Sequence, residues 1–261
     1  MTLRGSCAVI TGSTQGLGLV AAHRFAAAGC HVVLNGLVAP TDGSRIGEEI
    51  EARHGVRTRF CAADLRRPVE MARMIASAEE TFGSVDILVN NAVVRHTAPV
   101  EEFPSESWDE GIAVNLSAAF HLIRLVVPGM RRRNHGRIVN VSSIYGLTGA
   151  ANRVAYVTTK TGLVGLTRAI ALELAGTRVT CNAVCPGTVL TPVHEESVQR
   201  LMIAERLSRE AAERRFLTGK QPTGRFVSAD QVAALMVFLC GPDSGEITGA
   251  ALPVDGGWSA G

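Results

Sequence analysis

Three side chains in the second half of the chain have the types and the spacing needed to move a proton onto or off an alcohol. Tyr156 and Lys160 are four residues apart in a segment with helical periodicity, so both would project from one face of a helix. Ser143 comes thirteen residues before Tyr156, at the end of the run GRIVNVSS, which is typical of a strand. Each residue alone could be structural, because a serine at a strand end often caps a helix. Their combined placement favours catalysis.

The chemistry that fits these residues is the interconversion of a secondary alcohol and its ketone. Oxidation by hydride transfer needs a base for the hydroxyl proton, and reduction needs an acid that returns it. A tyrosine with its ordinary pKa of about 10 is poorly matched to neutral pH, but a positive charge on Lys160 would lower that pKa. Ser143 would hold the substrate oxygen beside the phenol of Tyr156. The hydride itself requires a cofactor.

A glycine-rich turn directly after the first predicted strand could hold such a cofactor. Residues 11–18 read TGSTQGLG, and helical periodicity continues from there to about Gly29. Glycines allow the backbone to approach a pyrophosphate closely, and the amino end of a helix offers free N–H groups to phosphates. The spacing is TGxxxGxG, whereas the common dinucleotide pattern is GxGxxG, and a glycine turn can also be purely conformational. Its position between a strand and a helix predicts dinucleotide binding.

The choice between NAD and NADP is expected at the end of the second predicted strand, which reads Asn35-Gly36-Leu37. An acidic residue here is typical of NAD, and an arginine is typical of NADP. The acid is missing, but residues 12–18 and 35–37 also contain no basic residue that could pair with a 2′-phosphate. We therefore predict NAD, with Asn35 hydrogen-bonded to the ribose and Leu37 in the space of the phosphate.

The elements that must position these residues alternate between short β-branched runs and longer segments with apolar residues three and four apart. This alternation predicts the α/β class: one Rossmann-type, doubly wound, parallel sheet of seven strands with helices on both faces. Strands are expected at 7–11, 31–35, 56–61, 85–90, 136–142, 178–184 and 250–254, and helices near 16–29, 44–54, 68–82, 105–133, 154–175 and 229–240.

One region departs from the alternation. From Thr188 to about Arg225 no strand pattern occurs, and a polar, helix-prone stretch fills the gap. Because it follows the carboxyl end of a strand, where open α/β sheets bind ligands, we predict a helical substrate lid at about 188–225. A purely structural helical pair is the alternative. We find no linker or repeat, so residues 1–261 are expected to form a single catalytic domain.

Composition narrows the choice of partners and location. The net charge of +2 gives no reason to expect nucleic acid, and the six scattered cysteines, without a CxxC pair, indicate reduced core residues and no metal site. A basic run, Arg131–Arg133 with His135 and Arg137, is interpreted as a solvated helix end. No signal peptide or uncharged apolar span is evident, which predicts a cytoplasmic protein that does not bind membranes.

With these motifs in order, the sequence resembles the short-chain dehydrogenase/reductase family over essentially its whole length. The resemblance implies that Asn115, within Val-Asn-Leu-Ser, is a fourth catalytic residue that holds a water between Lys160 and solvent. It also implies a homotetramer with contacts along helices 105–133 and 154–175. The chain has Val93 where the family has glycine. The residues expected to bind the cofactor are Gly12, Ser13, Thr14, Gln15, Gly16, Leu17, Gly18, Asn35, Leu37, Asp64, Leu65, Asn91, Ala92, Tyr156, Lys160, Pro186, Gly187, Thr188, Val189 and Thr191.

Within that family the sequence is similar to the bacterial D-3-hydroxybutyrate dehydrogenases, through features such as His96-Thr97-Ala98 and the run Lys220-Gln221-Pro222. This resemblance implies NAD-linked oxidation of a 3-hydroxy acid. The positions that bind the carboxylate are only partly retained, and Thr188 replaces a tryptophan that narrows the pocket. We therefore expect an anionic but bulkier substrate. The residues expected to bind it are Arg95, Ser143, Tyr145, Arg153, Tyr156, Thr188, Ser197 and Trp258.

Three other functions remain open from the sequence. A dehydrogenase or carbonyl reductase for a bulkier neutral secondary alcohol would use the same proton-transfer residues. A 3-oxoacyl carrier-protein reductase would require NADP, which the missing basic anchor disfavours. A non-catalytic nucleotide-sensing or scaffold protein could share the fold, because fold alone does not determine function. The set Asn115, Ser143, Tyr156 and Lys160 argues against this last alternative.

Overall fold

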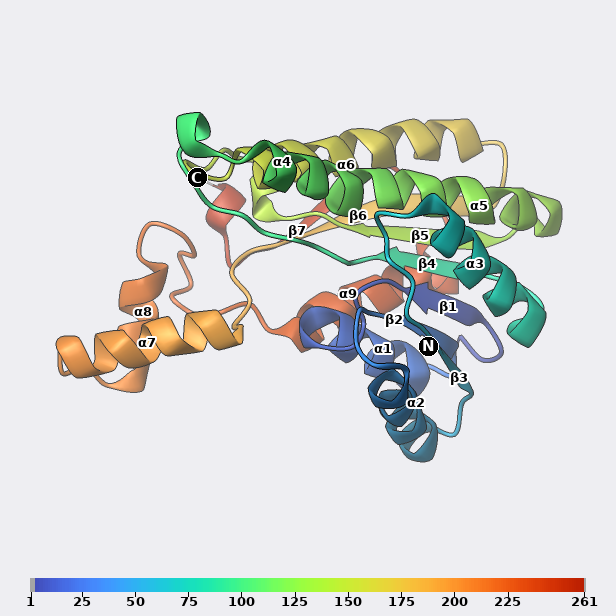
Figure 1. Cartoon of the computed structure of the whole chain (residues 1–261), viewed down its shortest axis with the longest axis horizontal. Coiled ribbons are helices and arrows are strands. Elements are labelled where there is room, and N and C mark those ends of the chain that lie inside the picture. Colours follow the sequence, from blue (N-terminus) through green and yellow to red (C-terminus); the bar gives the residue numbers. More distant parts are fainter. Residues whose placement is uncertain (1–2, 261) are drawn as a thin grey trace.

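The protein folds around one parallel β-sheet that is covered by helices on both faces (Figure 1). The computed structural model describes residues 3–260, and for residues 192 and 193 it describes the backbone only. The strands lie in the order β3-β2-β1-β4-β5-β6-β7, and all neighbours are parallel. This confirms the predicted doubly wound, seven-stranded sheet. The strands are β1 (Cys7–Ile10), β2 (His31–Asn35), β3 (Thr58–Cys61), β4 (Ile87–Asn90), β5 (Gly136–Val141), β6 (Val179–Pro186) and β7 (Ala251–Val254).

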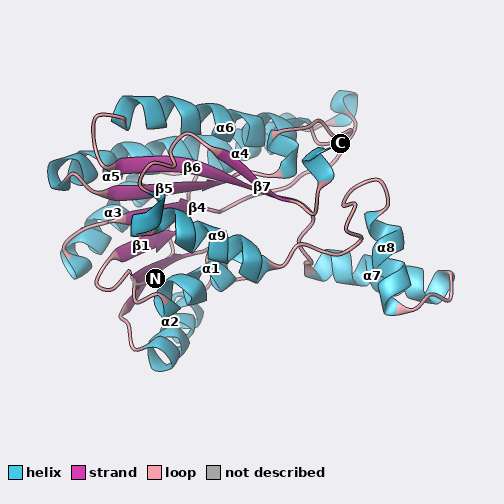
Figure 2. Cartoon of the chain, turned by 180° about the vertical axis from the view of Figure 1, so that it is seen from behind, coloured by secondary structure: helices cyan, strands magenta, loops and turns pink. Residues whose placement is uncertain are grey.

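Seven of the helices divide between the two faces of the sheet (Figures 1 and 2). Helices α1, α2 and α9 cover one face, and α3, α4, α5 and α6 cover the other. The order of the strands reverses between β1 and β4, which is the place where open α/β sheets bind dinucleotides. The helices are α1 (Gly16–Ala27), α2 (Pro40–His54), α3 (Pro68–Phe82), α4 (Ser105–Ile112), α5 (Ala118–Arg133), α6 (Val154–Leu174), α7 (Pro192–Ala204), α8 (Arg209–Leu217) and α9 (Ala229–Cys240).

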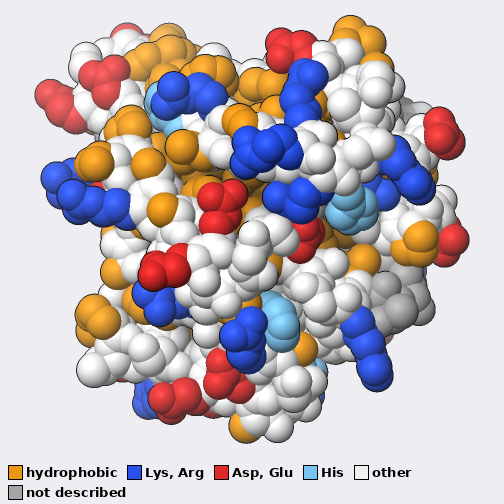
Figure 3. Space-filling view, turned by 90° about the vertical axis from the view of Figure 1, so that its right-hand side faces the viewer, with side chains coloured by type: hydrophobic (Ala, Val, Ile, Leu, Met, Phe, Trp, Pro, Cys, Tyr) orange, Lys and Arg blue, Asp and Glu red, His pale blue; other side chains and the backbone are white. Residues whose placement is uncertain are grey.

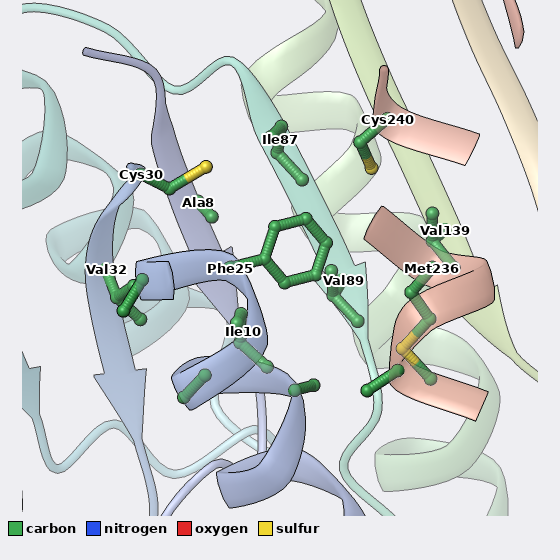
Figure 4. Close-up of a cluster of buried hydrophobic side chains, with 14 of the residues drawn as sticks. Ala8, Ile10, Phe25, Cys30, Val32, Ile87, Val89, Val139, Met236 and Cys240 are labelled. Carbon is green, nitrogen blue, oxygen red and sulfur yellow. The ribbon is translucent and has the colours of Figure 1, made fainter. Parts of the chain in front are cut away.

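Two large hydrophobic clusters, one on each face, and a small third cluster between α6 and β6 hold the layers together. On the first face the ring of Phe25 from α1 lies between residues of β1 and β4, such as Ile10 and Val89, with Met236 of α9 beside them (Figure 4). The inner strands are buried on both sides, which explains their nearly continuous apolar sequences. The edge strands β3 and β7 are only partly buried.

Two helices differ from their predicted bounds. Helix α2 begins at Pro40, four residues earlier than expected, because a proline at the first helical position costs no hydrogen bond. The predicted helix 105–133 is interrupted by a π-helical turn, Ala113–Ser117, between α4 and α5. By length and composition alone the stretch Ser105–Arg133 could also cross a membrane. In the fold, α5 instead buries one side against the second hydrophobic cluster.

Helices α7 and α8 extend beyond the carboxyl ends of the strands, apart from both faces of the sheet (Figures 1 and 2). Arg209 joins the two helices through its ion pairs with Glu195 of α7, at 2.6 Å, and Glu213 of α8, at 2.5 Å. An isolated parallel bridge between Val189 and Val227 closes the base of this segment. The region predicted as a lid is thus helical and lies at the ligand-binding edge of the sheet.

Candidate active site

The glycine turn after β1 packs tightly in a way that only glycine permits. Gly12 has a φ of 60°, and a Cβ there would lie 2.9 Å from Cα of Ala92. A Cβ on Gly18 would overlap the carbonyl oxygen of Gly12, so α1 could not begin this close to the turn with any other residue. Gly16 also has a positive φ, 55°, but a Cβ there would meet no atom within 4 Å. Its backbone is therefore open to a ligand.

Helix α1 offers its amino end to the same place. Its N-cap residue, Gln15, makes no side-chain hydrogen bond to the helix, and its first turn contains no acidic residue. The first-turn N–H groups of α1 are therefore available to an anion and carry the positive end of the helix dipole. Together with the open backbone at Gly16, this arrangement fits the pyrophosphate of a dinucleotide.

Side chains around the turn hold it against the neighbouring strand ends. Asn91, just after β4, donates from its amide nitrogen to the carbonyls of Thr11, at 2.9 Å, and Gly12, at 3.1 Å. The hydroxyl of Thr11 accepts the backbone N–H groups of Asn91 and Ala92. Ser13 is buried and donates to the carbonyl of Ile10. These contacts fix the shape of the turn, and the part of Ser13, Asn91 and Ala92 in cofactor binding stays a prediction.

The hydrogen bond expected from Asn35 to the ribose needs correction. Asn35 is buried, its Nδ2 donates to the carbonyls of Cys61, at 3.1 Å, and Ala63, at 2.9 Å, and its Oδ1 accepts the N–H of Gly12 at 3.3 Å. Its polar atoms are therefore used in joining the ends of β2 and β3 to the glycine turn. Leu37, by contrast, is 69% exposed and remains free to face a ligand.

The segment after β3 contains two of the residues that the family resemblance places at the cofactor, Asp64 and Leu65. Leu65 is buried in the second hydrophobic cluster, and Asp64 forms a short ion pair with Arg66 at 2.7 Å. The hydrogen bonds from Arg66 hold the pKa of Asp64 below its ordinary value, so Asp64 is a carboxylate at neutral pH. Both residues follow the end of β3. They come directly after Ala63, whose carbonyl accepts a hydrogen bond from the side-chain amide of Asn35.

Ser143, Tyr156 and Lys160 meet beyond the carboxyl end of β5. Ser143 begins the short 3-10 helix Ile144–Gly146 and accepts the backbone N–H of Tyr145 at 3.2 Å. Tyr156 and Lys160 lie one turn apart in α6 and are 7% and 2% exposed. The Nζ of Lys160 lies 5.7 Å from the centre of the Tyr156 ring, and Ser143 is close enough to the phenol to lower its pKa. The three residues predicted from their spacing are thus brought together.

The charges in this cluster suit proton transfer. Burial alone would raise the pKa of Tyr156, but the positive charges of Lys160 and Arg95 and the hydrogen bonds from Ser143 and Arg95 hold it below the ordinary value. Burial lowers the pKa of Lys160 to about 8, against the opposing effect of Tyr156, so its ammonium group persists at neutral pH. That group donates to the carbonyl of Val141 at 2.7 Å. The phenol is therefore a stronger acid than free tyrosine.

Asn115 lies in the π-helical turn between α4 and α5, a kind of irregularity that is often found at functional sites. Its Oδ1 accepts the N–H of Val94 at 2.8 Å, and its Nδ2 donates to the carbonyl of Val94 at 3.0 Å and to the hydroxyl of Thr159 at 3.4 Å. Its amide thus ties the loop after β4 to α6, next to the turn of Tyr156. A water link from Asn115 to Lys160 would have to use the main chain of Asn115.

Two arginines and two further aromatic rings surround Tyr156. The guanidinium of Arg95 lies 5.5 Å from the centre of the Tyr156 ring, and that of Arg153 lies 5.8 Å from the centre of the Tyr145 ring. Tyr145 packs edge-on against Tyr156, at 6.4 Å, and against Trp258, at 5.4 Å. Among residues 3–260 no acidic side chain lies within ion-pair distance of Arg95 or Arg153. Four of the predicted substrate residues therefore form one cluster with the tyrosine.

Two basic residues of the lid region were missed by sequence analysis as site residues. Burial lowers the pKa of His194 on α7, and the charges of Arg95, Lys220 and Arg153 lower it further, against the hydrogen bond with the carbonyl of Val189. Burial and the charge of Arg153 also lower the pKa of Lys220. Both residues thus lie within electrostatic reach of the arginines. Sequence alone does not distinguish such a polar side chain from a solvated one. The only signal is the run Lys220-Gln221-Pro222, which is a feature of the resemblance and does not by itself indicate part of a site.

The segment after β6 is held by Gln221. The Oε1 of Gln221 accepts the N–H of Thr188, and a Cβ on Gly187 would lie 2.8 Å from that oxygen. Thr191 caps α7 by accepting the N–H of His194 at 3.4 Å. Pro186 is the last residue of β6, and Gly187, Thr188 and Thr191 follow it. Ser197 lies further along α7 and accepts a hydrogen bond from Arg200 at 3.1 Å.

Comparisons with known proteins show relatives that cover nearly the whole chain. A family model described as short chain dehydrogenase matches residues 6–201. The D-beta-hydroxybutyrate dehydrogenase of Cupriavidus necator is 43% identical over 258 residues, which are 99% of either chain. The enzyme of the same name from Rhizobium meliloti is 42% identical and covers 97% of this chain and 98% of its own. The crystal structure of L-sorbose reductase from Gluconobacter frateurii, complexed with NADPH and L-sorbose, superposes with a TM-score of 0.91 at 31% identity, covering 99% of this chain and 98% of that one.

Proposed function

Because this chain belongs to the short-chain dehydrogenase family, we propose that it interconverts an anionic 3-hydroxy acid and the corresponding 3-oxo acid, with NAD as its cofactor. Membership of the family makes the protein an oxidoreductase that acts on CH–OH groups. The observation that carries the proposed substrate class is the pair of arginines, Arg95 and Arg153, which stand beside the Tyr156 cluster without acidic partners among the described residues. A substrate carboxylate supplies the missing negative charge.

The proton-transfer step follows from the position of Tyr156. When bound, the nicotinamide cofactor supplies the acceptor for the hydride that leaves the alcohol carbon. Tyr156, as phenolate, takes the hydroxyl proton, while the hydroxyl of Ser143 holds the same substrate oxygen. Lys160 keeps its positive charge beside the phenolate and so favours that form over the neutral phenol. In the reverse direction Tyr156 returns the proton to the ketone oxygen as the hydride arrives.

The substrate carboxylate is assigned to the arginines because of their geometry. Guanidinium groups bind carboxylates through paired charge-assisted hydrogen bonds, which fix both position and orientation. The guanidinium of Arg95 lies over the ring of Tyr156, and that of Arg153 lies over the neighbouring ring of Tyr145. A carboxylate bound by both arginines would therefore lie next to the phenol. Thr188 stands where the resemblance to 3-hydroxybutyrate dehydrogenases implies a tryptophan, and the smaller side chain leaves room for a bulkier acyl chain. Relatives named D-beta-hydroxybutyrate dehydrogenases support the 3-hydroxy acid class.

NAD is proposed because the exposed side chain at the ribose end of the site is Leu37. Neither the glycine turn nor residues 35–37 contain a cation for a 2′-phosphate, and a phosphate without a partner would be costly to desolvate. The solved relative with NADPH shows that the fold also accepts the phosphorylated cofactor. The choice is therefore made by local residues, and the ratio of activities with NAD and NADP tests it.

We also propose that the protein is a homotetramer and that it is located in the cytoplasm. Phe120 on α5 and Leu172 on α6 are large apolar side chains that are exposed in the single chain, which favours burial of these helices between subunits. Light scattering coupled to size-exclusion chromatography measures the subunit number directly.

The substrate class is tested with pairs of compounds that differ only in charge. NAD reduction is measured for 3-hydroxybutyrate and longer 3-hydroxy acids, each beside its neutral methyl ester, in the parent and in an Arg153→Ala variant. We expect KM for the acids to rise about tenfold or more in the variant, because a charge-assisted pair is lost, while the esters are little affected.

Arg45→Ala, which removes an exposed arginine from α2, serves as the matched control and should leave both KM values unchanged. Equal turnover of acids and esters by the parent enzyme would refute the anionic substrate and favour a bulkier neutral alcohol.

A further inference from the structure

The face opposite the lid contains a second hollow that the dehydrogenase site does not use. It has a volume of about 290 Å³ and lies at the amino ends of the strands, between the start of the chain, the start of β5 and the end of α9. Figure 3 shows this side of the molecule, where lysine or arginine side chains gather with a histidine among them near the middle. The hollow is lined by Leu3, Arg4, Ser6, His135, Arg137, Cys240, Gly241 and Pro242.

Arg137 is the unusual residue of this hollow, because it is a buried cation without a counter-charge. Only 6% of Arg137 is exposed. Its Nη1 donates to the carbonyls of Gly136 and Arg178, each at 2.9 Å, but its buried Nε has no hydrogen-bond partner. No carboxylate within residues 3–260 lies in ion-pair range of it. A buried guanidinium that is left in this state is costly, even with the carbonyl end of α9 nearby.

The neighbours of Arg137 cannot neutralise its charge. Arg4, a second cation, lines the same hollow. His135 lines it too, but burial and the charges of Arg137, Arg133 and Arg178 lower its pKa, so its ring is neutral at neutral pH and can serve as a hydrogen-bond donor. Burial raises the pKa of the Cys240 thiol well above its usual range, so that group stays neutral. Asp86, whose charge acts on His135, already accepts hydrogen bonds from the N–H of Cys7, at 3.0 Å, and from Ser84, and it is paired with Arg133 at 3.4 Å.

We propose that this hollow binds a phosphate group, either as inorganic phosphate or as the phosphate of a small phosphomonoester. A dianion suits a site with two guanidinium groups and an imidazole donor, because it supplies both the charge and the acceptors that Arg137 lacks. The basic run that ends in His135 and Arg137 thus includes part of a binding site as well as a solvated helix end. The hollow lies at the other end of β5 from Ser143, so the two sites are separate.

Calorimetric titration tests the proposal with inorganic phosphate and with glycerol 3-phosphate, at constant ionic strength and with acetate as the monovalent comparison. We expect saturable binding of both compounds. The compound with the lower Kd shows whether the site prefers inorganic phosphate or a phosphomonoester. A variant that combines Arg4→Ala with His135→Ala should bind about tenfold more weakly or worse. Arg137→Met should abolish binding, and if it does not fold the double variant decides, since its two substituted residues are exposed.

Two control proteins separate this site from others. Arg45→Ala and the double variant of Arg95→Ala with Arg153→Ala should both bind phosphate as the parent does, because the first removes an unrelated surface charge and the second removes the substrate-side arginines. Absence of saturable binding, acetate binding as tight as phosphate, or unchanged affinity in the Arg4→Ala/His135→Ala protein would each overturn the proposal. None of these results bears on the dehydrogenase activity, which is measured separately.

Discussion

Arg95 places its guanidinium 5.5 Å from the centre of the Tyr156 ring and lowers the pKa of the phenol, so a second cation acts on the residue that is proposed to transfer the proton. Lys160 is the first cation, at 5.7 Å from the same centre. Because both charges favour the phenolate, the acidity of Tyr156 in this chain depends on a residue outside the Ser143, Tyr156 and Lys160 set. Arg95 would therefore act on both the substrate and the base.

The first prediction concerns the pH dependence of Arg95→Gln. Arg95 lowers the pKa of Tyr156 and that of Lys160, so its removal raises both. The limb of kcat/KM for alcohol oxidation that rises as Tyr156 loses its proton should then move to higher pH. A pH profile of the parent and the variant measures this shift. Arg95→Lys, which keeps a charge, should recover part of it, and superimposable profiles for all three proteins would contradict the prediction.

The second prediction is that Tyr156→Phe loses activity without losing structure. The phenylalanine keeps the ring that packs against Tyr145 but removes the phenolic group that exchanges the proton. We expect kcat to fall by about 10²–10⁴-fold, which is typical for loss of a general acid–base. Cofactor affinity by fluorescence titration and the melting temperature should stay near the parent values. Turnover at the parent rate would remove Tyr156 from the mechanism.

Much of the fold could be predicted because burial and periodicity act locally. The inner strands, such as β1, are buried on both faces and therefore have the nearly continuous apolar sequence that identified them. Tyr156 and Lys160 could be paired because helical geometry alone fixes residues four apart on one face. Both inferences depend on the chain within a few residues, so the sequence was sufficient.

Other features depend on contacts between distant segments and could not be predicted. From the sequence, Asn35 is a candidate ribose ligand. The fold brings Gly12, Cys61 and Ala63 to its side-chain amide, and they occupy its hydrogen-bonding atoms. The π-helical turn that contains Asn115 leaves no mark in an otherwise helical pattern. Lys220 becomes part of a basic cluster only because the chain after α8 returns toward Arg153. In each case a long-range contact decides the role.

The third prediction concerns the cofactor. Leu37→Arg places a cation at the exposed position where a 2′-phosphate would lie, and Leu37 is not part of the buried core that the change could disturb. We expect the preference for NAD over NADP, measured as the ratio of kcat/KM values, to fall by about tenfold or more. Val100→Arg adds the same charge at another exposed apolar position and should leave the ratio unchanged. An equal change in both variants would mean that net charge, and not position 37, sets the ratio.

The last prediction concerns the base of the segment that we predict to be a lid, where Gln221 bonds the backbone on both sides. This side chain is 3% exposed, accepts the N–H of Thr188 and donates to the carbonyl of Arg225. Gln221→Leu would leave both backbone groups unpaired, at a cost of about 1–3 kcal/mol for each one that stays buried. Because that cost is relieved when the segment opens, hydrogen exchange and proteolytic cleavage between residues 188 and 227 should become faster, and KM should rise as the lid closes less often.

Gln199→Leu makes the same substitution on the exposed face of α7, where the side-chain amide donates to Glu195, and it should change neither the exchange rate nor the cleavage rate. If the two variants exchange alike, the lid is held by the remainder of its contacts, such as the Arg209 ion pairs, and Gln221 has no special part in its closure.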